Sequence, residues 1–203
     1  MSDLPTSPSA ERNKQPILDV LRRTLGPQGR ALEIAAGTGQ HAVWFAAGLS
    51  PWLWQPSEAD ARMLPLLSRR VEEAALPNLQ APVLLDVTAP QWPAQGPAFG
   101  REFDAVFCAN MLHIAPWAAC AALMDGAARH LRPGGLLLTY GPYFEEGLEV
   151  PSNQAFDEDL RARNPAWGIR RLDDVVAQAA RAGLQLRERH AMPANNLLLV
   201  FAR

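Results

Sequence analysis

Four polar residues stand where apolar runs of the sequence are expected to end as strands: Glu33, Glu58, Asp86 and Asn110. The first belongs to residues 31–41, which read as a strand, a Gly37-x-Gly39 turn and the start of a helix. Glycines let the backbone of such a turn pass close to a bound group, and the helix start offers unpaired N–H donors. A carboxylate near the end of a buried strand is costly without a partner. The pattern therefore predicts a cofactor with hydroxyl or ammonium donors at this turn.

The spacing of the acids favours an adenosine cofactor. Glu58 lies 21 residues after Gly37, where nucleotide-binding sheets place an acid that accepts both ribose hydroxyls. Asp86 can accept a hydrogen bond from the exocyclic adenine amine. A single acid at a strand end is more often solvated surface. Four polar strand ends in the correct order favour adenosine binding.

The glycine turn also satisfies the loose dinucleotide pattern, Gly37-x-Gly39-x-x-Ala42, which alone is weak evidence. Two features disfavour a dinucleotide. Glu33 near the turn would repel a pyrophosphate, and the hairpin expected at the end of the chain is not usual for a dinucleotide sheet. S-adenosylmethionine carries an ammonium and a sulfonium and no phosphate, so it is the cofactor that this turn favours.

Strands that alternate with helices predict a parallel sheet covered on both faces, in a single domain of residues 1–203. The expected strands are 31–34, 52–56, 82–88, 103–110, 136–140, 184–189 and 197–201. The expected helices are 9–25, 42–47, 63–71, 117–130 and 172–182. The short connection between the last two strands predicts an antiparallel final hairpin.

Two segments are expected to enclose the site. Residues 141–168 form a long polar insertion, typical of binding loops and lids, placed over the acceptor pocket. Residues 1–25 form an N-terminal segment with Ser9 as N-cap and a break at Pro16. Its polar cluster 11–14, which holds Arg12 and Asn13, is either a solvated helix start or a lid over the cofactor.

Methyl transfer from a sulfonium is an in-line displacement that needs alignment and, for a hydroxyl or thiol acceptor, a base. His113 follows the fourth strand and can titrate near neutrality, although packing of its loop explains it equally well. Tyr143 and Asp157 are the other candidate catalytic residues, and Tyr140 and Asn153 are further candidates to line the acceptor pocket. His41 is expected to pack at or cap the glycine turn.

The totals exclude several classes of protein. The 203 residues are 48% hydrophobic, which suits one domain with a substantial core. A net charge of -2 gives no reason to expect nucleic acid or an anionic membrane as partner. Without a signal pattern or an apolar run of membrane-spanning length, we expect a cytoplasmic protein. Cys108 and Cys120 form no metal spacing, so no metal is expected, and the oligomeric state stays open.

Residues 32–39 resemble the first motif of class I methyltransferases, usually written with Asp or Glu and then Gly-x-Gly-x-Gly, with Ala35 at the first glycine. Ser57-Glu58, Asp86-Val87, 103–110 and 131–135 resemble the later motifs. The resemblance implies a Rossmann-like fold: a seven-stranded, mostly parallel sheet with a C-terminal antiparallel hairpin and helices on both faces. The cofactor residues that it implies, for S-adenosylmethionine, are Arg12, Asn13, Glu33, Ala35, Gly37, Gly39, Ser57, Glu58, Asp86, Val87, Asn110 and Met111.

More narrowly, the chain is similar to the methyltransferase-like protein 26 family, through 9–14, 39–41, 55–57, 108–111, 151–153 and 164–170. That family has no established substrate, so the acceptor stays open. Residues 164–167 superficially resemble a motif of enzymes that methylate nucleic-acid bases, but that motif follows strand four. With no basic stripe either, we expect a small-molecule acceptor. The alternatives are a non-catalytic protein that binds S-adenosylmethionine or a partner, and a nicotinamide-dependent oxidoreductase.

Overall fold

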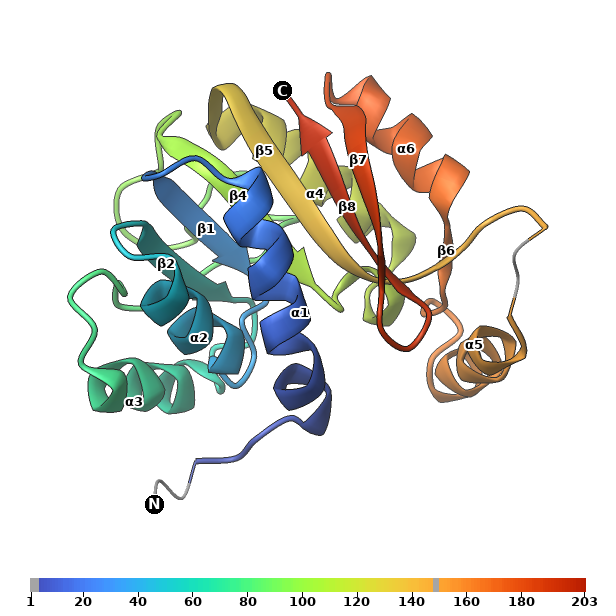
Figure 1. The fold of residues 1–203 in the computed structure, drawn as a ribbon, viewed down its shortest axis with the longest axis horizontal. Helices are drawn as coiled ribbons and strands as arrows, with labels where there is room; N and C mark the ends of the chain where they lie inside the picture. The colour runs from blue at the N-terminus through green and yellow to red at the C-terminus, as the bar shows by residue number, and fades with distance from the viewer. Residues whose placement is uncertain (1–3, 148–149) are drawn as a thin grey trace.

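A mixed sheet runs through the molecule in the strand order β3-β2-β1-β4-β5-β8-β7, with β6 attached to β5 (Figure 1). The computed structural model describes residues 4–147 and 150–203. Its strands are β1 Arg30–Ile34, β2 Leu53–Glu58, β3 Val83–Leu84, β4 Phe103–Ala109, β5 Leu131–Phe144, β6 Arg170–Arg171, β7 Gln185–Met192 and β8 Asn196–Ala202. The predicted mostly parallel sheet with a final antiparallel hairpin is confirmed, with eight strands rather than seven because β6 is an additional short strand.

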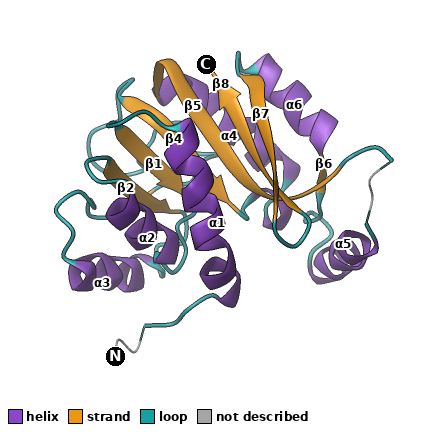
Figure 2. Cartoon of the chain, viewed as in Figure 1, coloured by secondary structure: helices purple, strands orange, loops and turns teal. Residues whose placement is uncertain are grey.

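Helices cover both faces of the sheet (Figure 2). They are α1 Pro8–Thr24, α2 Gln40–Gly48, α3 Leu64–Ala74, the 3-10 turn η1 Leu112–Ile114, α4 Trp117–His130, α5 Pro151–Arg163 and α6 Leu172–Arg181. Side chains alternate between the two faces along a strand. Leu32 and Ile34 therefore pack into the core under α4 and α6, whereas Ala31 packs into a second core under α1 and α2.

Helix α1 corrects two details predicted for the N-terminal segment. Its N-cap is Ser7 rather than Ser9, with the Ser7 hydroxyl accepting from the Ala10 N–H. The helix runs through Pro16 without a break. Burial of Ile17, Leu18 and Leu21 against the sheet holds the two halves in line, although Pro16 removes one backbone hydrogen bond.

The predicted insertion of residues 141–168 is shorter than expected. Its first four residues extend β5, which is fourteen residues long, and α5 occupies much of the remainder. The third strand is also shorter than predicted, because only Val83–Leu84 pairs with β2 and Asp86 lies in the following turn.

The start of α1, the turn η1, helix α5 and the turn between β7 and β8 meet at the edge of the sheet where the parallel strands end (Figure 1). The amide of Asn153 on α5 donates to the carbonyl of Asn195 in the hairpin turn at 3.2 Å, so the two segments are joined directly. Among the described residues, no helix is both long and apolar enough to cross a membrane.

Candidate functional site

The glycine turn after β1 is closed by the acid at the end of β2. The Gly37 N–H donates to Glu58 Oε2 at 2.8 Å, and Glu58 Oε1 accepts from the N–H groups of Ala59 at 2.9 Å and Asp60 at 3.2 Å. A carboxylate offers about four lone-pair sites, so about one stays open on Glu58. Glu58 therefore shapes the turn and still has capacity for a ligand hydroxyl.

Gly37 and Gly39 have different roles. Both have positive φ, 54° and 76°, which favours glycine. A Cβ on Gly37 would meet no atom within 4 Å, so this residue borders open space. A Cβ on Gly39 would lie 2.5 Å from Leu67 Cδ1 on α3, so Gly39 permits close packing of the turn against that helix. The sequence predicts that Gly39 contacts the cofactor, but Gly39 does not line the cavity that opens above this turn.

A cavity of about 660 Å³, which we call the loop cavity, opens above this turn. The predicted cofactor residues that line it are Ala35, Gly37, Glu58, Asp86, Val87, Asn110 and Met111. Among the described residues that line it, the charged side chains are those of Glu58 and Asp86, and none is Lys or Arg. Of the four polar strand ends, Glu58, Asp86 and Asn110 line this one cavity. His41 also borders it and hydrogen-bonds Asn13 Oδ1 through Nε2 at 2.7 Å.

Two predicted cofactor residues face away from the loop cavity. Glu33 is buried on the α1 and α2 side of the sheet, where its Oε2 accepts from Trp54 Nε1 at 2.6 Å. Burial raises the pKa of Glu33 to about 8, and the Trp54 hydrogen bond opposes this shift. Ser57 is also buried, and its hydroxyl donates to the Glu33 carbonyl at 2.7 Å. The sequence predicts a ligand as the hydrogen-bond partner of Glu33. In the structure that partner is Trp54 on the neighbouring strand β2.

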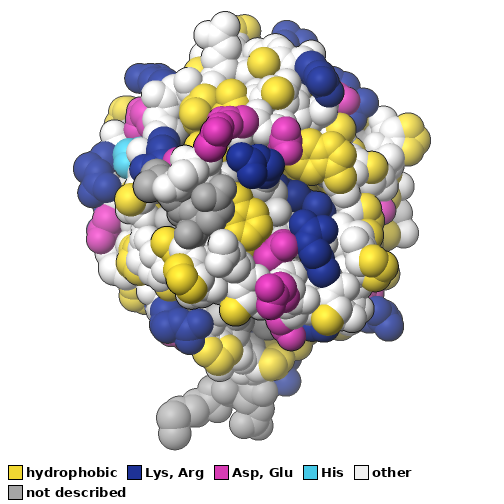
Figure 3. Space-filling model, turned by 90° about the vertical axis from the view of Figure 1, so that its right-hand side faces the viewer, with side chains coloured by type: hydrophobic (Ala, Val, Ile, Leu, Met, Phe, Trp, Pro, Cys, Tyr) yellow, Lys and Arg dark blue, Asp and Glu magenta, His cyan; other side chains and the backbone are white. Residues whose placement is uncertain are grey.

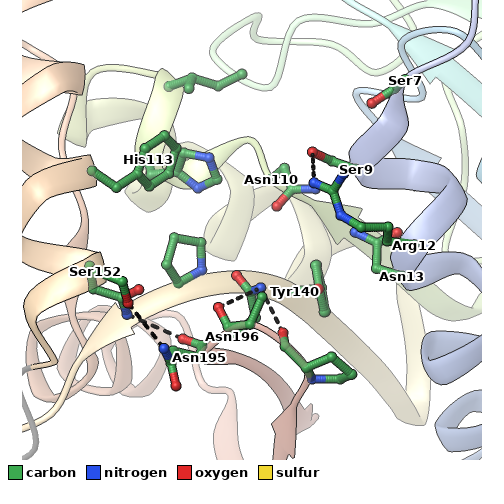
Figure 4. A pocket seen from close by; sticks show the side chains of 16 residues that line it. Ser7, Ser9, Arg12, Asn13, Asn110, His113, Tyr140, Ser152, Asn195 and Asn196 are labelled. Carbon is green, nitrogen blue, oxygen red and sulfur yellow. Dashed lines mark hydrogen bonds between the residues drawn. The ribbon is translucent and has the colours of Figure 1, made fainter.

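A second cavity, of about 640 Å³, lies beside the first (Figure 4). We call it the amide cavity because four asparagines outside α1 line it: Asn110, Asn153, Asn195 and Asn196. Arg12 and Asn13, expected at the cofactor, border this cavity from α1 instead. Ser7, Asn110 and Ile114 line both cavities, so the two meet at this point.

Asn110 is held at this junction in an unusual backbone conformation. Its φ is 60°, in the left-handed region that asparagine tolerates better than most residues. Its amide has no hydrogen-bond partner among the described residues, and its backbone N–H donates to the Tyr140 carbonyl at 2.8 Å. Such strain is typical of ligand-binding positions.

His113 lines the amide cavity from η1 and is buried. Burial lowers the pKa of His113 to about 4, and the nearby Arg170 charge acts in the same direction. The imidazole is therefore neutral through the physiological range, and one of its ring nitrogens is free of a proton and can accept a hydrogen bond. A Cβ on Gly141 would lie 3.4 Å from His113 Nδ1, so the glycine leaves room around this ring.

The other two catalytic candidates lie elsewhere. Tyr143 is buried in the core under α4 and α6, and its hydroxyl donates to Thr139 Oγ1 at 2.8 Å. It is out of phase with Tyr140 and Pro142, the two β5 residues that border the amide cavity. Asp157 faces away from the cavity, accepting from Arg161 Nε at 2.7 Å and from the Ile169 N–H at 2.6 Å. Strand alternation in the sequence could have excluded Tyr143.

The final hairpin contributes to the amide cavity, which the sequence did not indicate. Asn195 and Asn196 lie in the short connection between the last two strands and border the amide cavity, where Asn195 Nδ2 donates to Ser152 Oγ at 3.0 Å. No pattern in the sequence places this turn next to α5. Asn153, a candidate to line the acceptor pocket, also borders this cavity and is buried.

Figure 3 shows Lys and Arg side chains interspersed with Asp and Glu on the face seen from the right of Figure 1. Among the described residues, no group of three or more His, Cys, Asp or Glu could hold a metal ion.

A family model described as "Protein of unknown function (DUF938)" matches residues 4–203. The chain is also similar to solved structures of class I methyltransferases, which shows the fold. The S-adenosylmethionine-dependent methyltransferase SibL in its apo form shares 20% identity at a TM-score of 0.78, covering 96% of this chain and 55% of that one. The O-methyltransferase family 2 protein from Planctomyces limnophilus, in complex with apigenin, shares 17% identity at 0.77, covering 96% and 60%.

Human N-acetylserotonin methyltransferase, in complex with S-adenosylmethionine, shares 13% identity at a TM-score of 0.78, covering 96% of this chain and 52% of that one. The chain thus spans between 52% and 60% of the length of these three proteins.

Proposed function

Because the chain belongs to the DUF938 family of proteins of unknown function, its activity has to come from its own site, and we propose S-adenosylmethionine-dependent methyl transfer to a small molecule. One observation carries the proposal: a loop cavity built from the polar strand ends joins a second cavity that contains a neutral histidine. The fold likeness to methyltransferases and the resemblance to the methyltransferase-like protein 26 family support it.

The lining of the loop cavity fits a cofactor with hydroxyls, an amine and no phosphate. Glu58 would accept from one ribose hydroxyl, and Asp86 with Val87 would border the adenine. Asp86 Oδ1 already accepts from the N–H and hydroxyl of Thr88 at 2.8 and 2.7 Å, which fixes its orientation. Two carboxylates without a cationic neighbour in the lining would repel a pyrophosphate, which disfavours a nicotinamide dinucleotide.

The amide cavity would hold the acceptor. S-adenosylmethionine, when bound, supplies an electrophilic methyl group that leaves its sulfur and bonds to the acceptor atom. Asn110 at the junction would orient the two molecules, because its amide has no hydrogen-bond partner among the described residues and its backbone is fixed. His113 would take the proton that a hydroxyl acceptor loses.

Two measurements test the proposal. Calorimetric titration of the full chain should show binding of S-adenosylhomocysteine and no binding of NADH or NADPH. Incubation with methyl-labelled S-adenosylmethionine and a metabolite extract should transfer label to a small molecule, and His113→Asn should lower this transfer without changing the affinity for S-adenosylhomocysteine.

Absence of S-adenosylhomocysteine binding would contradict the cofactor assignment. Binding without transfer to any extract component would favour a non-catalytic binding protein. Equal transfer by wild type and His113→Asn would remove His113 as the base while leaving the activity in place.

A further inference from the structure

The amide cavity is bordered by a positive side chain and by no negative one among the described residues that line it. Among the described residues that line it, Arg12 is the permanently charged side chain, and none is Asp or Glu. Arg12 hydrogen-bonds Ser9 Oγ through Nη2 at 3.2 Å and has no carboxylate partner among the described residues. A guanidinium directed into a cavity without an acid is suited to an oxyanion brought by a ligand.

The surroundings strengthen this positive character. Glu11, the acid nearest to Arg12 in sequence, hydrogen-bonds Lys14 and Gln40 and does not border the cavity. Behind His113, the Arg170 guanidinium is fixed on backbone carbonyls, with Nε donating to the Leu112 oxygen at 2.9 Å. Glu11 therefore makes its hydrogen bonds away from the exposed Arg12 side chain, and Arg170 adds a second positive charge.

The positions of these side chains also suggest how an acceptor would lie. Arg12 reaches into the cavity from α1, and His113 stands on the opposite side (Figure 4). Apolar surface from Ile114, Pro142 and Phe156 lies along the cavity wall. A molecule with its anionic group on Arg12 would cross this apolar surface and present its other end to His113, close to the junction with the loop cavity.

We propose, on the basis of the proposed function, that the methyl acceptor is a small hydroxy acid whose oxyanion group binds Arg12 and whose hydroxyl lies at His113. A guanidinium binds carboxylate and phosphate in the same forked geometry, so either oxyanion fits. Arg12 then selects the acceptor and does not hold the cofactor, as its place in the amide cavity indicates.

Matched probes test this selection in the full chain saturated with S-adenosylhomocysteine. The probes are 4-hydroxybenzoate, 4-hydroxyphenyl phosphate and the neutral 4-hydroxybenzamide, each titrated by calorimetry. We expect at least one acid to bind wild type about tenfold or more tightly than the amide. Comparison of the two acids shows which oxyanion the site takes.

Arg12→Gln should reduce the affinity for the acid to that of the amide and leave the affinity for S-adenosylhomocysteine unchanged. Arg23→Gln removes the same charge near the other end of α1, outside both cavity linings, and should behave as wild type. Together these variants separate the position of Arg12 from a general loss of positive charge.

Equal binding of amide and acids, retained acid selectivity in Arg12→Gln, or failure of both acids to bind would overturn the proposal while the proposed function stands. Loss of S-adenosylhomocysteine affinity in Arg12→Gln would also overturn it, because Arg12 would then hold the cofactor. If wild type does not bind S-adenosylhomocysteine, the proposed function fails, and this inference fails with it.

Discussion

The loop cavity and the amide cavity have nearly equal volumes, about 660 and 640 Å³, and opposite charge. The first is bordered by two carboxylates and the second by one guanidinium. Because they meet at Asn110, a molecule in one can contact a molecule in the other. The contrast suits two different ligands, a cationic nucleoside and a small anion, held side by side.

The two cavities also differ in what builds them. The loop cavity depends on backbone: the Gly37 N–H of the glycine turn and the N–H groups of Ala59 and Asp60 after β2 all donate to the Glu58 carboxylate. The amide cavity depends on side chains from segments far apart in sequence, including α1, α5 and the β7–β8 turn. Changes in its lining can therefore alter which acceptor binds without disturbing the turn at which the cofactor would lie.

The largest expected effect is on the pH dependence of the unfolding free energy. The variant is Glu33→Gln, and it tests whether Glu33 lies outside the loop cavity. With an ordinary pKa of 4.5 and a value raised by burial to about 8, Glu33 is protonated in the folded protein at neutral pH and ionised in the unfolded chain. The raised pKa of Glu33 therefore stabilises the folded protein most below pH 4.5. As the pH rises from 4.5 to 8, this contribution is lost, and the unfolding free energy falls by on the order of 4 kcal/mol. Denaturation of wild type and Glu33→Gln at several pH values should show their difference changing by this amount.

Two controls accompany this measurement. Burial lowers the pKa values of His41 and His113 to about 4 from 6.5, so both proteins lose stability as pH falls below 6.5, and this loss cancels in the difference. S-adenosylhomocysteine affinity should change by about twofold or less, since Glu33 bonds Trp54 and does not border the cavity. A much larger loss of affinity would indicate that Glu33 contacts the ligand in the loop cavity.

The second effect in size concerns Glu58. Glu58→Ala removes the acceptor of three backbone N–H groups and the expected ribose contact, so affinity for S-adenosylhomocysteine should fall roughly 10- to 100-fold by calorimetry. Asp60→Ala is the matched control, because Asp60 pairs with Arg62 and does not border the cavity. Equal affinities in wild type and Glu58→Ala would contradict the ribose assignment.

The amide cavity was less predictable from the sequence than the loop cavity, for a physical reason. The carboxyl ends of neighbouring parallel strands share one edge, so Glu58, Asp86 and Asn110 could be placed together from their order alone. Whether Glu33 faces the ligand depends on strand alternation and on Trp54, which is adjacent only through the β1–β2 pairing. Contacts such as Asn153 with the Asn195 carbonyl join segments 42 residues apart, and no local pattern encodes them.

The smallest expected effect concerns the residue at which the turn departs from the methyltransferase motif. Ala35 has a φ of 55°, and the left-handed conformation costs an L-residue about 1–2 kcal/mol. Glycine avoids that strain but loses about 0.5–1 kcal/mol more in conformational entropy on folding. Ala35→Gly should therefore raise the unfolding free energy by up to about 1 kcal/mol, measured as a shift in the urea midpoint at constant slope.

The neighbouring alanine provides the matched control for this change. Ala36 is not among the residues with positive φ, and it is buried, so Ala36→Gly brings the entropic cost and the loss of a buried methyl group and should lower stability by about 1–2 kcal/mol. Opposite signs at adjacent positions in one turn would assign the effect to backbone conformation. If both variants are destabilised equally, Ala35 is unstrained, and its methyl group instead contributes packing to the wall of the loop cavity.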